Sequence, residues 1–191
     1  MNILILLISS LGGLYNSQPS NEIVFMTNGI SYYDGKVFYN RKNTLSEKDM
    51  FCATSLIYHE AKSAYQKNPQ ALYNVFQVIL NRAKKNNKSL CEISKEKGQW
   101  SNFKLSRYNK ISKTKLWKDI KVSLNWYYER IDVYQYRFKK ITRHDATRMY
   151  YFAAYRIGRL KYHGIQITSD RKFCPKKYIN MAGHIYYASN Q

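Results

Sequence analysis

The stretch SEKDMFCATSLIYHEAKSAY, residues 46–65, decides the fold of this chain because it predicts a long amphipathic helix. Ser46 is followed three residues later by Asp49, which is typical of a helix N-cap with an acidic first turn. Beyond this start, apolar residues recur at spacings of three and four, which places them on one helix face together with a glutamate. The residues that share this face are Ala53, Leu56, Ile57 and Glu60. The pattern therefore directs Glu60 toward the interior.

The segments on either side of this helix predict a hairpin and a second helix. Upstream, YYDGKVFY (residues 32–39) places Asp34-Gly35 between alternating aromatic residues, which is typical of a β-hairpin. Downstream, Asn68 and Pro69 suit the cap and the first position of a helix that closes at KKNNKS, residues 84–89.

The later part of the chain predicts further helices followed by loops or strands. Apolar spacing indicates helices over residues 112–131 and 144–157, and a loop-like or β-like pattern from Gly158 onward. A chain of 191 residues is long enough for one domain with a real core. We therefore expect a mainly α fold of the α+β type, with a small β-hairpin or β element.

The N-terminal segment is distinct from this domain. Ile3–Ile8 is an apolar run followed by small residues, and it is too short to span a membrane. Residues 1–15 are similar to a signal peptide, and the alternatives are a buried first strand or a flexible arm. Residues 16–45 are expected to form an N-terminal arm or hairpin, and residues 46–191 the main domain.

The charge balance is strongly basic and restricts the partners of the protein. The chain has 32 Lys and Arg against 12 Asp and Glu, a net charge of +20 spread along its length. Such a protein is attracted to polyanions, which include nucleic acid, anionic cell-envelope polymers and phospholipid headgroups. An AT-rich genome, which favours lysine, asparagine and tyrosine codons, is an alternative source of much of this charge.

The three cysteines, Cys52, Cys91 and Cys174, are far apart and form no CxxC pair. This spacing argues against both a disulfide framework and a zinc knuckle. At least one cysteine has no partner within the chain, so their number leaves the redox compartment open. We expect no metal and no cofactor.

Glu60 has three interpretations. The first is a zinc site: a zinc-binding helix of the metalloprotease type requires H-E-x-x-H, and the second histidine is missing after His59-Glu60. A structural ion pair, for example with Arg82, is the second hypothesis. The third is catalysis, because a carboxyl group held against apolar residues has a raised pKa and can serve as a general acid on a glycosidic oxygen.

Five short segments in a fixed order bear on this choice. They are Tyr58–Lys62 (YHEAK), Val78–Arg82 (VILNR), Leu90–Ile93 (LCEI) with Gln99–Phe103 (QWSNF), Tyr162–Gly164 (YHG) and Gly183–Tyr187 (GHIYY). In this order they resemble the SleB-like cell-wall hydrolases, the family of spore-cortex-lytic enzymes and related phage lysins. The resemblance covers residues from about 50 to 188.

This resemblance implies a lysozyme-like catalytic domain that cuts the glycan of peptidoglycan between N-acetylmuramic acid and N-acetylglucosamine. Glu60 would act alone as acid and then base, as in a lytic transglycosylase. By the same resemblance the glycan would be bound by Gln99, Trp100, Tyr162, His163 and His184. For Trp100 the alternative is core packing, and for His163 and His184 it is a structural role.

The chain departs from the family pattern directly after the glutamate. Ser63 and Ala64 stand where the family has a glycine and a second glutamate, so hydrolysis and transglycosylation both stay open. The resemblance implies export to the periplasm or cell wall, or residence in a phage virion, with peptidoglycan and anionic envelope polymers as partners and other virion proteins as candidates. The rival functions are a basic nucleic-acid-binding protein and a structural virion component with an inactive lysozyme-like domain.

Overall fold

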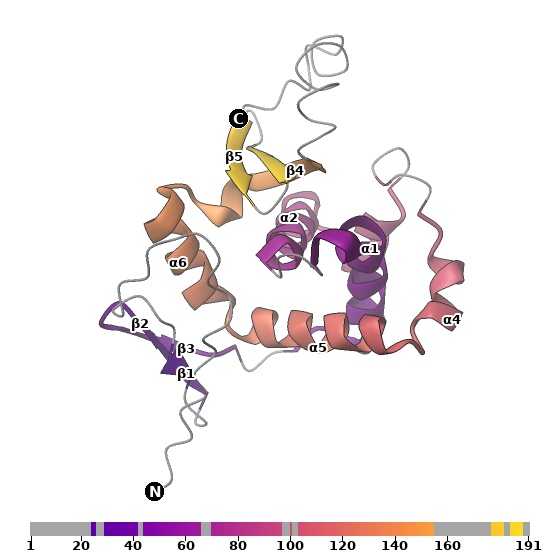
Figure 1. The fold of residues 1–191 in the computed structure, drawn as a ribbon, viewed down its shortest axis with the longest axis horizontal. Helices are drawn as coiled ribbons and strands as arrows, with labels where there is room; N and C mark the ends of the chain where they lie inside the picture. Colours follow the sequence, from indigo (N-terminus) through magenta and orange to yellow (C-terminus); the bar gives the residue numbers. More distant parts are fainter. Residues whose placement is uncertain are drawn as a thin grey trace, which may run out of the picture.

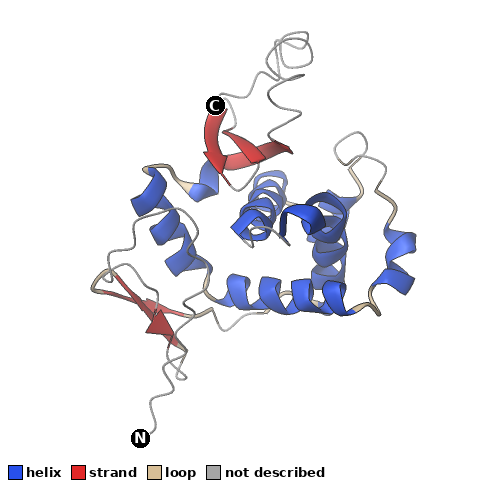
Figure 2. Ribbon diagram, in the orientation of Figure 1, coloured by secondary structure: helices blue, strands red, loops and turns tan. Residues whose placement is uncertain are grey.

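The computed structural model shows helices at the centre of the molecule and two small sheets at its edges (Figures 1 and 2). The helices are α1 (Glu47–Tyr65), α2 (Gln70–Asn86), α3 (Leu90–Ser94), α4 (Tyr108–Ile111), α5 (Lys115–Glu129) and α6 (Ile131–Thr142), with short 3-10 turns η2 (Leu105–Arg107) and η3 (Ala146–Arg148). The strands are β1 (Val24–Phe25), β2 (Ile30–Tyr33), β3 (Lys36–Tyr39), β4 (Met149–Ala154), β5 (Lys177–Met181) and β6 (His184–Ala188). The structure describes residues 24–25, 29–41, 44–65, 70–96, 100, 103–154, 177–181 and 184–188. In this part of the chain the fold is mainly α, as predicted.

Helix α1 begins where the sequence predicts. The backbone N–H of Asp49 donates to the Ser46 hydroxyl oxygen at 3.0 Å, which satisfies one of the free amide groups of the first turn. The carboxylates of Glu47 and Asp49 lie in that turn, where the positive end of the helix dipole favours them. Asn68 and Pro69, the predicted start of α2, lie outside the described residues, and α2 is followed by Asn87 at a φ of 51°.

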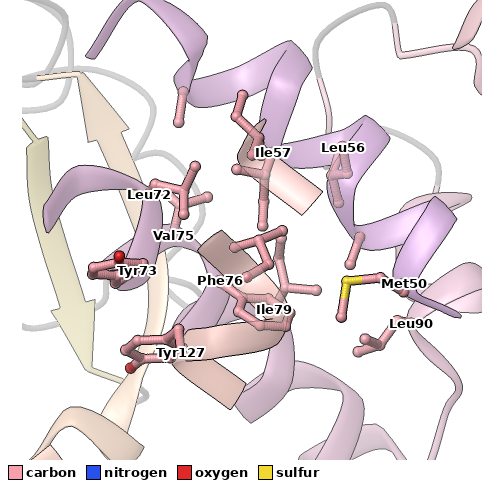
Figure 3. Packing of buried hydrophobic residues seen from close by; sticks show 14 of the residues in the cluster. Met50, Leu56, Ile57, Leu72, Tyr73, Val75, Phe76, Ile79, Leu90 and Tyr127 are labelled. Atoms are coloured by element: carbon pink, nitrogen blue, oxygen red, sulfur yellow. The ribbon is translucent and has the colours of Figure 1, made fainter. Parts of the chain in front are cut away.

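Helices α1, α2 and α5 enclose the core (Figure 3). Leu56 and Ile57 of α1 pack with Phe76 of α2, and all three side chains are fully buried. Ile120 and Leu124 of α5 are fully buried members of the same cluster. Burial of each such side chain stabilises the fold by roughly 1.5–3 kcal/mol, so this apolar face holds α1 in position.

The first sheet contains the predicted hairpin. Strands β2 and β3 are antiparallel, and Asp34 and Gly35 form the turn with φ angles of 54° and 71°. Positive φ at both central turn positions is typical of the type I′ turn, which matches the twist of the two strands. The hairpin packs on α6, where the Tyr136 hydroxyl donates to the Asp34 carboxylate at 3.2 Å.

The second sheet corrects the prediction of a helix over residues 144–157. Residues 146–148 form η3, and the chain continues as β4, which pairs with the central strand β6 in the order β4-β6-β5. The aromatic sequence MYYF at residues 149–152 suits a pleated strand, and its apolar spacing is equally compatible with a helix. Pairing with a distant strand decided between the two.

The predicted helix over residues 112–131 is also shorter than expected, and a further helix was missed. Thr114 caps α5 by accepting from the Trp117 backbone N–H at 3.4 Å, and the helix ends at Glu129. The chain bends at Arg130 and continues as α6. The apolar pattern runs through this bend, so the sequence did not reveal it.

The prediction against a disulfide is wrong. Cys52 of α1 and Cys91 of α3 form a disulfide, with their Cα atoms 5.0 Å apart. The two residues are separated by 39 positions in sequence, and only the packing of α3 against α1 brings them together. Cys174 lies outside the described residues.

Candidate active site

Glu60 lies near the C-terminal end of α1, on the border between the core and the surface. Leu56, Ile57 and Ala61 around it on the helix are fully buried, and the Glu60 side chain is 18% exposed. Its Oε1 atom is buried and has no hydrogen-bond partner within the described part of the chain. The helical phase therefore predicted the direction of this carboxyl group correctly.

This environment favours the protonated form of Glu60. Burial raises the pKa of the carboxyl group above its ordinary value, and the positive charge that His59 can carry partly opposes this effect. The reason is that the charged carboxylate loses hydration on burial, whereas the neutral acid loses little. A carboxyl group that keeps its proton toward neutral pH is suited to general acid catalysis.

His59 connects Glu60 to a second element. The His59 Nε2 atom lies 3.9 Å from Glu60 Oε1, and the opposite ring nitrogen, Nδ1, lies 2.8 Å from the Tyr108 hydroxyl. Burial and the neighbouring Glu60 charge raise the pKa of Tyr108 to about 12, so this hydroxyl keeps its proton and can donate it to Nδ1. In that arrangement the N–H of the neutral ring is on Nε2, the nitrogen nearest to Glu60.

Aromatic side chains form a wall around His59. Phe103 stacks on Tyr108 with ring centroids 5.3 Å apart, and the His59 ring meets Phe103 edge-on at 5.6 Å. Tyr58 meets Tyr108 edge-on from the other side at 6.1 Å. Phe103, Tyr58 and His59 are each partly exposed, so the wall reaches the surface beside the carboxyl group.

The sequence missed the members of this wall for a clear reason. His59 precedes Glu60, and the sequence analysis considered it only as part of an H-E-x-x-H zinc motif, whose second histidine is missing. Tyr108 lies 49 residues from His59 in sequence, and no spacing rule links the two. The one signal available was the aromatic character of residues 103 and 108 within a basic loop.

The hypothesis of an ion pair between Glu60 and Arg82 is not supported. The Arg82 guanidinium binds the Glu96 carboxylate and lies over the Trp100 ring at 5.1 Å from its centroid. Among the described residues the charged partner of Glu60 is His59.

The predicted glycan-binding residues are placed as follows. Trp100 is 9% exposed within the core cluster, and its indole N–H donates to the Ile93 carbonyl oxygen at 2.7 Å. These are contacts of a packing residue, and none of them reaches Glu60. His184 begins β6, with its backbone opposite Ala154 and Met181. The other three, Gln99, Tyr162 and His163, lie outside the described residues.

A separate hollow lies at the opposite end of α1. It has a volume of about 430 Å³, and its lining includes Asp49, Lys84 and Lys88. Asp49 and Glu60 are three helical turns apart, roughly 16 Å along the helix axis. The hollow is therefore distinct from the Glu60 region and contributes nothing to its chemistry.

Three further observations complete the description of the molecule. Among residues with described positions, no three histidine, cysteine or acidic side chains are grouped to hold a metal ion. In the same residues, no helix has the length and apolar character needed to cross a bilayer. No family model, curated protein or solved structure matched this chain. The resemblance to the cell-wall hydrolases therefore rests on the quoted sequence segments.

Proposed function

We propose that this protein cleaves the glycan strands of peptidoglycan, with Glu60 as the acid that protonates the glycosidic oxygen. The observation that carries the proposal is the Glu60 carboxyl group itself, mostly buried, without a hydrogen-bond partner for Oε1 among the described residues, and with a raised pKa. The motif order from Tyr58–Lys62 to Gly183–Tyr187 supplies the substrate class. The mainly helical fold is compatible with the lysozyme-like architecture that we propose for the domain.

In the first chemical step, protonated Glu60 donates to the oxygen that joins N-acetylmuramic acid to N-acetylglucosamine. The bond between this oxygen and the muramic acid C1 breaks as positive charge develops on the sugar ring. In the second step, the Glu60 carboxylate accepts the proton of the muramic acid 6-hydroxyl, and that oxygen bonds to C1. The products are a 1,6-anhydro sugar and a new glycan end, and Glu60 has its proton again.

The choice of transglycosylation over hydrolysis rests on the number of carboxylates. Hydrolysis by inversion or retention ordinarily uses two, whereas ring closure by the substrate's own hydroxyl needs one. Among the described residues, the charged group that acts on Glu60 is His59, not a second carboxylate. The partly exposed rings of Phe103 and Tyr58 offer apolar faces on which sugar rings can pack.

The Cys52–Cys91 disulfide supports an extracytoplasmic location as part of this proposal. Disulfides form and persist mainly in oxidising surroundings such as the periplasm, the cell surface and virions. These are the places where peptidoglycan is accessible, so the proposed substrate and the disulfide are compatible.

The proposal is tested by incubating peptidoglycan sacculi with wild type, Glu60→Gln and Glu47→Gln. Glu47 lies on the same helix with its side chain 86% exposed, which makes it a matched control. Wild type and Glu47→Gln should release 1,6-anhydro muropeptides, identified by mass, and Glu60→Gln should be at least about 100-fold slower because a general acid contributes roughly 10²–10⁴-fold. Equal rates for Glu60→Gln and wild type would overturn the assignment, and products with reducing ends would indicate hydrolysis.

The pH dependence provides a second test with a defined sign. Because burial raises the pKa of Glu60, the active protonated form persists above the pH at which an exposed glutamate loses its proton. The rate at saturating substrate should fall as pH rises through this raised pKa. A rate that is unchanged through neutral pH would contradict the role of Glu60 as the acid.

Nucleic-acid binding is the competing function, and the net charge of +20 is the observation that favours it. It predicts affinity for DNA that falls steeply with salt, together with no release of muropeptides. A protein that neither releases muropeptides nor binds nucleic acid would instead match the structural virion component.

A further inference from the structure

The segment from η2 to the first turn of α5 carries the densest positive charge in the described part of the chain. From residue 104 to residue 118 it contains six basic residues and no acidic one. All six side chains are exposed, and we refer to them together as the basic strip. The members of the basic strip are Lys104, Arg107, Lys110, Lys113, Lys115 and Lys118.

Half of the strip is regularly spaced along the chain. Lys104 directly precedes η2, Arg107 is its last residue, and Lys110 lies in α4, so an exposed basic side chain recurs at every third residue. Lys115 forms an ion pair with Asp119, whereas Lys104, Arg107 and Lys110 form none with any residue that the structure describes. Their charges are therefore available to a partner.

The inner side of the same segment contacts the candidate active site. Tyr108 lies between Arg107 and Lys110 in sequence, is buried, and holds His59 through the 2.8 Å hydrogen bond. The basic strip therefore lies on the outside of the element whose inside closes over the Glu60 region. In Figure 1, α4 stands beside α1 and leads into α5 at the edge of the molecule.

We propose that the basic strip binds a phosphodiester polymer attached to the peptidoglycan and thereby holds the enzyme on its substrate. The inference rests on the proposed function, because the polymer must lie beside the glycan that reaches Glu60. A row of unpaired cations attracts a flexible chain of phosphates through Coulomb attraction and counterion release, without any shaped pocket.

The strip does not have the features expected of a nucleic-acid site. Binding of single strands uses exposed aromatic rings on which bases stack, and both aromatic residues of this segment, Tyr108 and Trp117, are buried. Reading of duplex DNA uses a helix that enters the major groove. The unpaired group Lys104, Arg107 and Lys110 lies at or beside η2 and α4, which comprise three and four residues and are too short for this role. The strip therefore favours a polyanion recognised by its charge alone.

The test compares two variants of equal net charge in a Glu60→Gln background, which prevents degradation of the wall. The strip variant carries Lys104→Gln, Arg107→Gln and Lys110→Gln. The control variant carries Lys139→Gln, Arg143→Gln and Arg148→Gln, which remove three exposed charges from the α6 end of the molecule. Co-sedimentation with sacculi that retain the phosphodiester polymer, and with sacculi stripped of it by hydrofluoric acid, gives the affinities.

The strip variant should bind the polymer-bearing sacculi about tenfold more weakly than the control variant at low salt, because three phosphate contacts are lost. The difference should disappear on stripped sacculi and at high salt, where charges are screened. Equal losses of affinity for the two variants would overturn the proposal in favour of diffuse charge. Binding of duplex DNA is measured in parallel, and if the strip variant loses affinity for DNA but not for the sacculi, the proposal is overturned in favour of nucleic acid.

The same experiment tests the proposed enzymatic activity independently of polymer binding. With Glu60 restored, the strip variant should release the same muropeptides as wild type from stripped sacculi. Wild type that sediments through the strip but releases no muropeptides would refute the proposed enzymatic activity. The same result would support binding of the polymer by the strip.

Discussion

At the scale of the residue, the proposed chemistry depends on how the Glu60 carboxyl group is held. Most carboxylates in the described chain are at the surface or in ion pairs, for example Glu96 with Arg82 and Asp132 with Arg41. Glu60 differs because burial raises its pKa and its Oε1 atom has no hydrogen-bond partner in the part described. A carboxyl group of this kind destabilises the fold when it is ionised, so the position of Glu60 at the edge of the core makes it a candidate functional residue.

His59 is predicted to set the proton affinity of Glu60. When the His59 ring is protonated, its positive charge 3.9 Å from Oε1 favours the carboxylate, so His59→Gln should raise the pKa of Glu60. The shift is measured by NMR titration of the ¹³C-labelled glutamate side chain, without any need for activity. The falling limb of the rate against pH should move to higher pH by the same amount.

Other ionisable groups face this pair, and they define the control. Lys62 lies over the Tyr58 ring on α1 itself, and Tyr108 approaches His59 from α4. Lys62→Gln removes an exposed charge from the same helix and should leave the pKa of Glu60 nearly unchanged. An unaltered Glu60 titration in His59→Gln would show that the histidine serves only in packing.

At the scale of the element, local signals predicted the start of α1 and the hairpin turn. Ser89 and Glu92 form a capping box on α3, with the Ser89 N–H donating to the Glu92 carboxylate at 2.7 Å. This hydrogen bonding lowers the pKa of Glu92, the opposite of the effect of burial on Glu60. The two glutamates show that hydrogen bonding, burial and neighbouring charge decide whether a carboxyl group is a cap or a candidate acid.

The Cys52–Cys91 disulfide is predicted to be the main covalent support of the α1–α3 pair. A closed loop of 39 residues stabilises the fold by roughly 2–4 kcal/mol, chiefly by restricting the unfolded chain. Cys52→Ser/Cys91→Ser should lose this amount in urea unfolding, and reduction of wild type should produce the same loss. Cys174→Ser is the control, and a loss of equal size there would point to a different pairing.

At the scale of the whole molecule, one buried amide joins the helical core to the second sheet. The Asn81 side-chain N–H₂ group donates to the carbonyl oxygens of Ala146 at 2.9 Å and Met149 at 2.7 Å. Its own oxygen accepts from the Gln77 side chain at 2.6 Å. The Asn81 side chain is buried, and these hydrogen bonds satisfy both ends of its amide group.

Loss of this junction should be costly. Asn81→Ala removes one donor from each of the Ala146 and Met149 carbonyl oxygens and the acceptor of the Gln77 amide. The Ala146 oxygen still accepts from the Met149 N–H, so the free energy of unfolding should fall by about 1–3 kcal/mol. Asn86→Ala, an exposed position on the same helix, should change it by less than about 0.5 kcal/mol. Similar values for the two variants in denaturant unfolding would mean that β4 does not depend on Asn81.

Features that depend on near neighbours in the chain were predictable from the amino-acid order alone. Periodicity fixed the inward direction of Glu60, Ser46 fixed the start of α1, and Asp34-Gly35 fixed the hairpin, because each depends on backbone geometry over a few residues. Three features became visible only in the folded chain. They are the Cys52–Cys91 bond, the contact of His59 with Tyr108, and the strand over residues 149–154, where the sequence predicted a helix. These features join residues dozens of positions apart, and their free energy comes from burial and pairing that arise only when the chain is folded.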